Sequence, residues 1–209
     1  MTIYLDHAAT TPINSAALDA LNEQVKKLGN ASSVHNQGRS VRKDVEDARH
    51  KLSELIGCLP SEIIFTGSGT EANNLALKGF YWKSNKKLIV VAAFEHHAVL
   101  DPVEWLAEHD DAEVIFIPIN KSGYIDLNFL SELIQTRGDE IAVISVMHAN
   151  NEVGTIQPIT EIGKITEEKG VYLHTDAVAT AGILPIDVNE LDVDLLSLSS
   201  QQLYGPKGA

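Results

Sequence analysis

Four short polar stretches each follow an apolar run that is typical of a buried strand, and all four carry side chains able to bind a ligand. The first spans residues 66–74 (TGSGTEANN), where small residues and the hydroxyl of Thr70 open a helical pattern. Glycines let a ligand approach the backbone, and a helix N-terminus offers free N–H groups to a phosphate. Alone, this stretch fits a phosphate site and a glycine-rich turn capped by Thr70 equally well, and it lacks the lysine of a nucleotide P-loop.

The other three stretches offer aromatic rings, amides and a carboxylate. Residues 94–97 (FEHH) hold two adjacent histidines, residues 148–155 (HANNEVGT) hold two amides and a glutamate, and residues 174–177 (HTDA) hold Asp176. Each stretch has a purely structural alternative: surface histidines, a polar turn and a helix N-cap, respectively. No cysteine or carboxylate cluster has the spacing of metal ligands, so we predict no metal site.

Strand and helix patterns alternate between these stretches. Several apolar runs are continuous, which is typical of parallel strands covered by helices on both faces. The alternation predicts a three-layer α/β/α domain. Candidate strands lie at residues 62–66, 87–92, 113–117, 141–147, 171–174 and 195–198, with helical patterns at 70–81, 98–108, 128–136 and 159–169 and two earlier ones at 15–28 and 39–56.

The predicted sheet brings the four polar stretches together. Each stretch lies at the C-terminal end of a candidate parallel strand, which is where α/β sheets bind ligands. A phosphate cradle, an aromatic ring, amides and a carboxylate would then line one pocket. This combination suits a flat, phosphorylated heterocycle, and taken jointly it outweighs the structural alternatives.

The chain as a whole limits the choice of partners. Its 209 residues carry a formal net charge of −13, which argues against nucleic acid because a phosphate backbone repels so acidic a chain. No apolar run approaches the ~20 residues that span a bilayer, so we predict no membrane partner. Residues 1–6 lack the features of a signal peptide, and Cys58 is the single cysteine, which excludes an internal disulfide. The expected compartment is the cytoplasm.

Further motifs carry a family resemblance. Residues 4–12 (YLDHAATTP), 29–35 (GNASSVH) and 150–158 (NNEVGTIQP) resemble those of the cysteine desulfurases in the class V aminotransferase family, which are fold-type I pyridoxal-phosphate enzymes. Ala31 departs from the proline that is usual at its position. The resemblance covers the whole chain, and the four polar stretches belong to it.

This resemblance implies a fold, a reaction and partners. The large domain of the family has a mixed, mostly parallel sheet, a smaller C-terminal domain follows it, and the protein works as a homodimer. The reaction splits L-cysteine into L-alanine and an enzyme persulfide that feeds iron–sulfur cluster assembly. The implied cofactor is pyridoxal 5'-phosphate, and an iron–sulfur scaffold protein is among the expected partners.

By the same resemblance, residues of the four stretches take roles around the cofactor. The backbone of Gly69 and the hydroxyl of Thr70 would hold the phosphate, with a further contact from Ser199. The ring of His96 would stack on the pyridine ring, which makes His96 a catalytic residue as well. Asp176 would pair with the pyridinium nitrogen and so make the ring an electron sink.

The sequence departs from the family pattern inside this pocket. Asn151 is retained beside the 3-oxygen of the ring, but Ala179 stands where the family has a glutamine that donates a hydrogen bond to that oxygen. Gln202 occupies the position of the Schiff-base lysine, and Gln201, a predicted cofactor contact, replaces the histidine beside it. An amide nitrogen is neither nucleophilic nor basic, so we expect any bound pyridoxal phosphate to be held without a covalent link.

The last residues read as a loop that leaves a strand, so we expect an incomplete protein. We divide the chain into residues 1–50, an N-terminal arm with helices packed on the large domain, and residues 51–209, a large domain that lacks its last strand and the C-terminal small domain. The persulfide cysteine of the family would lie further along, and Cys58 is predicted to be structural or incidental. Two apolar strands would keep unpaired backbone groups, so we expect the isolated chain to associate.

Three functions are open at this point. The chain could be part of a working desulfurase, a desulfurase-like scaffold that docks partners without turnover, or an N-terminal fragment that needs its missing half for stability. The family motifs favour the enzyme. The glutamine pair at 201–202, together with Ala179, favours the scaffold.

Overall fold

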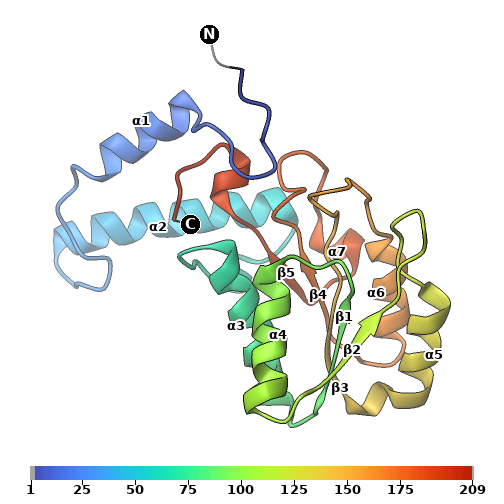
Figure 1. The fold of residues 1–209 in the computed structure, drawn as a ribbon. Coiled ribbons are helices and arrows are strands. Elements are labelled where there is room, and N and C mark those ends of the chain that lie inside the picture. The colour runs from blue at the N-terminus through green and yellow to red at the C-terminus, as the bar shows by residue number, and fades with distance from the viewer. Residues whose placement is uncertain (1–2, 209) are drawn as a thin grey trace.

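The computed structural model describes residues 3–208 (Figure 1). Two helices, α1 (Ser15–Gln24) and α2 (Asn36–Ile56), precede a region in which helices and strands alternate. The elements of that region are η1 (Pro60–Glu62), α3 (Gly69–Ser84), β1 (Leu88–Ala92), α4 (His97–His109), β2 (Glu113–Ile117), α5 (Leu127–Arg137), η2 (Gly138–Glu140), β3 (Ile141–Ser145), α6 (Ile159–Glu167), β4 (Leu173–Asp176), α7 (Val188–Leu191), β5 (Leu195–Ser197) and η3 (Ser200–Leu203).

The strands form one sheet in the order β2-β1-β3-β4-β5, and every neighbouring pair is parallel. Val90, in the middle of β1, lies in register with Ile115 of β2 and Ile144 of β3. The predicted α/β fold is confirmed. Within residues 3–208 the sheet is entirely parallel, so the antiparallel strand of a mixed sheet is not among the described strands.

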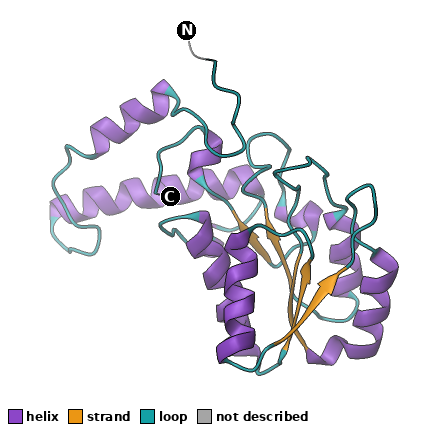
Figure 2. Ribbon diagram, viewed as in Figure 1, coloured by secondary structure: helices purple, strands orange, loops and turns teal. Residues whose placement is uncertain are grey.

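Helices cover both faces of this sheet (Figure 2). β1 and β3 are buried at every position, as expected of strands enclosed from both sides. Leu88 and Val90 pack in one core with residues of α5 and α6, whereas Ile89 and Val91 pack in a second core with residues of α3 and α4. The alternation of side chains along β1 therefore produces the three layers.

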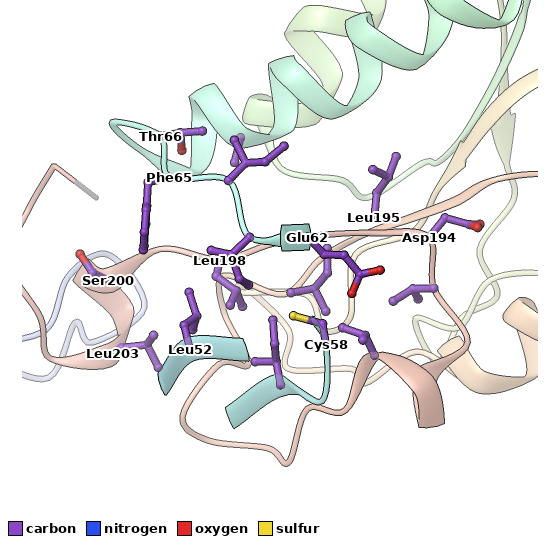
Figure 3. A pocket seen from close by; sticks show the side chains of 17 residues that line it. Leu52, Cys58, Glu62, Phe65, Thr66, Asp194, Leu195, Leu198, Ser200 and Leu203 are labelled. Carbon is purple, nitrogen blue, oxygen red and sulfur yellow. The ribbon is translucent and has the colours of Figure 1, made fainter. Parts of the chain in front are cut away.

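The strand predicted at residues 62–66 is wrong. Residue 62 ends the short helical turn η1, and the following residues pair with no strand in the described part of the chain. A cavity of about 380 Å³ lies between this segment and β5 (Figure 3), and Ile64 and Phe65 are 70% and 47% exposed. Extended backbone becomes a strand only beside a hydrogen-bonded neighbour, and here the nearest strand lies across the cavity.

Other predicted boundaries differ from the observed ones by a few residues. β4 runs from Leu173 to Asp176 rather than over 171–174, which carries Asp176 into the ladder opposite Ser197 of β5. The helix expected at 15–28 ends at Gln24. None of its residues is buried, and a helix without packing depends on local hydrogen bonds alone, so it ends early.

The N-terminal segment runs beside η3, close to the other end of the described chain (Figure 1). The N–H of Asn14 donates to the carbonyl of Tyr204 at 2.8 Å, and the hydroxyl of Thr11 donates to the carbonyl of Gln201 at 2.6 Å. The division at residue 50 into an arm and a large domain stays a prediction. No helix within residues 3–208 is both long and apolar enough to cross a bilayer.

Candidate cofactor-binding site

A cavity of about 630 Å³ opens at the C-terminal edge of the sheet. Its walls come from the N-terminal segment, the start of α3 and the loops that follow β1, β3, β4 and β5. The structure brings together every residue predicted to act on the cofactor, while their individual roles stay predictions. These lining residues are Gly69, Thr70, His96, Asn151, Asp176, Ser199, Gln201 and Gln202.

The start of α3 forms the predicted phosphate end of the cavity. Ser68 caps the helix by accepting a hydrogen bond from the N–H of Glu71 at 3.1 Å, and the hydroxyl of Thr66 donates to the carbonyl of Ser68 at 3.0 Å. A Cβ at Gly69 would lie 3.0 Å from Cγ2 of Val178, so a larger residue at this position would require Val178 to shift. The first N–H groups of α3 lie at the cavity wall, where a phosphate can accept from them.

Asp176 lies at the end of β4 and is 5% exposed. Its carboxylate accepts hydrogen bonds from Nδ2 of Asn73 at 2.7 Å and from the N–H of Val178 at 2.9 Å. Burial raises the pKa of Asp176, and both hydrogen bonds oppose that rise. None of the ion pairs within residues 3–208 includes Asp176. A buried carboxylate is stabilised by a cation, and the protonated nitrogen of a pyridine ring is a cation of suitable shape.

One of the two adjacent histidines belongs to the cavity. His96 lines it and caps α4, because its Nδ1 accepts a hydrogen bond from the N–H of Ala98 at 3.0 Å. Since Nδ1 is the acceptor, a neutral His96 carries its proton on Nε2. His97 is exposed and pairs with Asp101 at 3.2 Å, away from the cavity walls. The helix cap therefore fixes the ring of His96 at the site.

The glutamine pair ties the N-terminal segment to the cavity. Nε2 of Gln202 donates to the carbonyl of Ala8 at 2.8 Å, and Nε2 of Gln201 donates to the carbonyl of Ala9 at 3.1 Å. Both alanines line the cavity. The donor end of each amide is therefore engaged by the backbone of the segment that forms one wall.

The loop after β3 presents Asn151. The side chain of Asn150 accepts hydrogen bonds from the N–H groups of Glu152 and Val153, both at 2.9 Å, and so fixes the turn. Nδ2 of Asn151 donates to the carboxylate of Glu152 at 2.8 Å. Ala179 lines the same cavity, and its methyl group offers no hydrogen bond where the family glutamine would.

Sequence reasoning missed two buried polar side chains in these motifs. Oε1 of Glu95 accepts a hydrogen bond from the N–H of Met147 at 2.7 Å, but Oε2 of Glu95 and Oδ1 of Asn73 are buried without a partner among the described residues. Burial, aided by the charge of Asp176, raises the pKa of Glu95 to about 8. A glutamate placed between an apolar strand and the histidine of its loop was the signal that could have identified it.

His174 lies behind the cavity and joins three strands. It is fully buried, with Nδ1 2.9 Å from the hydroxyl of Ser145 in β3 and Nε2 3.0 Å from the hydroxyl of Ser197 in β5. Burial lowers the pKa of His174 to about 4, so the ring is neutral at neutral pH. Both ring nitrogens are engaged within the protein, which makes His174 a structural residue rather than a ligand contact.

Cys58 lies away from this cavity, in the wall of the cavity beside β5 (Figure 3). It is partly buried, and burial, aided by the charge of Glu62, raises the pKa of its thiol. A thiol with a raised pKa is a poor nucleophile at neutral pH. The location supports the structural role predicted for it.

The fold and the cavity together define a class of protein, an α/β domain with a polar cavity at the C-terminal edge of a parallel sheet. Residues 3–209 match the Aminotransferase class-V family, and the chain belongs to that family.

The similar curated proteins within this family are cysteine desulfurases, which confirms the resemblance. The chain is 47% identical over 209 residues to cysteine desulfurase IscS of Dictyoglomus turgidum, covering 99% of this chain and 52% of that protein. It is 44% identical over 210 residues to the IscS-like cysteine desulfurase of Mycobacterium tuberculosis, covering 98% and 53%. The chain spans about half the length of the curated relatives it matches.

Solved structures agree with this assignment. The structure of SspA in complex with cysteine superimposes with a TM-score of 0.93 at 35% identity, covering 99% of this chain and 59% of that one. A NifS-like protein also gives a TM-score of 0.93, at 34% identity, covering 100% and 57%. The fold of residues 3–208 is therefore that of a known desulfurase-like domain.

Proposed function

We propose that this chain forms the cofactor-binding part of a cysteine desulfurase, which mobilises sulfur from L-cysteine, giving L-alanine and a persulfide, for iron–sulfur cluster assembly. The observation that carries the proposal is the position of Asp176. Its buried carboxylate has no ion-pair partner among the described residues, and it lies in the same cavity wall as the start of α3 and the ring of His96. Family membership supports pyridoxal phosphate as the cofactor.

The residues present fit pyridoxal phosphate. The N-terminus of α3, which opens with Gly69 and Thr70, suits its phosphate, and the ring of His96 suits stacking. The buried Asp176, which has no ion-pair partner among the described residues, suits its ring nitrogen. When bound, the cofactor supplies an electron sink that stabilises negative charge developing on a substrate carbon. Asp176 would keep the ring nitrogen protonated, and His96 would hold the plane of the ring.

Two observations support a second candidate, a scaffold that keeps the pocket without turnover. Gln202 cannot act as a nucleophile or move a proton, and Ala179 cannot donate to the ring oxygen. The cysteine of the described chain lies in a different cavity. A desulfurase made from this chain would need its persulfide-forming thiol from outside the residues described.

The experiment compares two isosteric charge removals. Asp176→Asn should weaken the binding of pyridoxal phosphate at least tenfold, about 1.4 kcal/mol, because it removes the charge that would face the ring nitrogen. Asp101→Asn is the matched control, since Asp101 is exposed on α4 away from the cavity. The affinity of each variant for pyridoxal phosphate is measured by calorimetric titration. Equal affinities would show that Asp176 does not interact with the ring nitrogen.

The substrate, partners and location of the whole protein are also proposals. L-cysteine as substrate, a homodimer and an iron–sulfur scaffold protein as partner rest on the family resemblance. A cytoplasmic location is likewise only proposed, and one relative, from Candida albicans, is named as a mitochondrial cysteine desulfurase.

A further inference from the structure

We propose that this pocket selects the amine form of the cofactor, pyridoxamine phosphate, over its aldehyde form, pyridoxal phosphate. The inference rests on the proposed function, because it specifies which ligand the same cavity prefers. It follows from two features of the cavity: the charges of its walls and the orientation of its two glutamines.

The cavity offers an aldehyde no amine. The described residues that line it include no lysine or arginine, and Asp6 and Glu152 add two carboxylates besides Asp176, which the ring nitrogen of either ligand would face. An aldehyde condenses with a primary amine, with loss of water, and here it finds none. The surplus of negative charge instead favours a ligand that brings an additional cation, as the aminomethyl group of pyridoxamine phosphate does.

The glutamines add acceptors rather than donors. Nε2 of Gln202 and Nε2 of Gln201 already donate to backbone carbonyls of the N-terminal segment. Each Oε1 is left without a donor in the described part of the chain. An amide oxygen can accept a hydrogen bond from an ammonium group, whereas it has nothing to offer an aldehyde oxygen, which is itself an acceptor.

The two cofactor forms are a matched pair for testing this. They share the phosphate and the ring, so their contacts with α3 and Asp176 contribute equally to both affinities. Pyridoxine phosphate, with a neutral hydroxymethyl group, adds a hydrogen-bond donor without a charge. The three ligands differ only at this ring position. The aldehyde can condense with an amine, the hydroxymethyl group can donate a hydrogen bond, and the aminomethyl group adds a positive charge.

Calorimetric titration of the 209-residue chain with each ligand at neutral pH is the first measurement. We expect pyridoxamine phosphate to bind at least fivefold more tightly than pyridoxal phosphate, with pyridoxine phosphate between them. Added salt should narrow the gap between the amine and the alcohol, because it screens the cavity charges. Pyridoxal phosphate binding as tightly as the amine, or more tightly, would overturn the inference.

Two variants test the role of Gln202. Gln202→Leu keeps the approximate volume and removes the acceptor, so the amine-to-aldehyde affinity ratio should fall towards one. Gln202→Lys should reverse the ratio, because it provides a condensing amine and repels a second cation. The ratio is taken within one protein, so a partly unfolded variant does not distort it. An unchanged ratio in Gln202→Leu would contradict the role given to the amide.

The possible failures are distinguishable. If none of the three ligands binds, the proposed function fails and the inference fails with it. If all three bind with equal affinity, the cofactor site stands and only the selection of the amine is refuted.

Discussion

Gln202 decides which chemistry the cavity can perform on a ligand. It lies in the wall beside His96 and Asp176, yet its amide nitrogen is engaged by the carbonyl of Ala8. An amide in that position can hold a ligand and close the N-terminal segment over it. It cannot form a bond to the ligand or move a proton.

Replacing this residue by lysine should restore covalent attachment. In Gln202→Lys, borohydride reduction after incubation with pyridoxal phosphate should leave one stoichiometric cofactor adduct, seen by intact mass. Gln135→Lys is a matched control, since Gln135 is exposed on α5 and far from the lining residues. A stoichiometric adduct in the control, or none in Gln202→Lys, would refute the placement of residue 202 at the ring.

Covalent attachment should not restore turnover. Neither the unaltered chain nor Gln202→Lys should release sulfide or alanine from L-cysteine faster than free cofactor does. The reason is that Cys58 lies in the other cavity with a thiol whose pKa is raised by burial. Production of alanine above the free-cofactor rate by either protein would show that another group supplies the chemistry.

Glu95 should make the stability of the chain fall as the pH rises. Its pKa is about 8 in the folded chain against an ordinary 4.5, so between these values the folded state keeps a proton that the unfolded state has lost. The free energy of unfolding then decreases with pH, by up to about 1.4 kcal/mol per pH unit. His174, with a pKa of about 4 against 6.5, acts in the opposite direction only below pH 6.5.

The test is therefore made between pH 6.5 and 8, where Glu95 changes the stability and His174 does not. Urea unfolding of Glu95→Gln should show a flatter pH dependence than the unaltered chain, with the largest gain in stability at the upper end. Asp176, whose pKa burial also raises, is present in both proteins. Identical slopes in the two proteins would contradict the burial of an ionisable Glu95.

At the scale of elements, the cap of α3 matters more than the cap of α1. Ser68 caps a helix that packs in the core through Leu77, whereas Asn14 caps a helix with no buried residue. Ser68→Ala should lower the free energy of unfolding by about 1 kcal/mol. Asn14→Ala should change it by a few tenths at most, because α1 can fray without opening the core. Equal losses in urea titrations would show that α1 unfolds with the rest of the chain.

The sequence predicted most of the elements, because their signals are local. The continuous apolar runs of β1 and β3 and the polar stretches after them placed the cavity where the structure has it. The segment at 62–66 has the same composition as a strand, but whether it pairs depends on a neighbour that no local pattern reveals. The contacts of Glu95 and the orientation of Gln202 depend likewise on residues far away in the sequence.

At the scale of the whole molecule, the two edges of the sheet differ. The β2 edge is flanked by the ion pair of Glu113 with Arg137, at 2.6 Å, and charges of this kind discourage edge pairing. The β5 edge faces a cavity lined by Leu195, Leu196 and Leu198, with the exposed Phe65 opposite. The β5 edge is therefore the one expected to recruit another strand.

We expect the isolated chain to associate through this edge. Sedimentation and thermal unfolding should both depend on concentration, and Phe65→Lys should reduce the association by placing a charge at the cavity. Phe116→Lys is the matched control, because Phe116 is similarly exposed, at 45%, on β2. A monodisperse monomer with a concentration-independent transition would show that the β5 edge is closed in another way.

The central claim is that this chain binds a pyridoxal-phosphate cofactor in the cavity at the sheet edge without a covalent link. The most direct test is a titration of the unaltered chain with pyridoxal phosphate, followed by borohydride reduction and intact mass. We predict saturable binding of one cofactor per chain and an unchanged protein mass after reduction. Absence of saturable binding, or a stoichiometric adduct on any lysine, would contradict the claim.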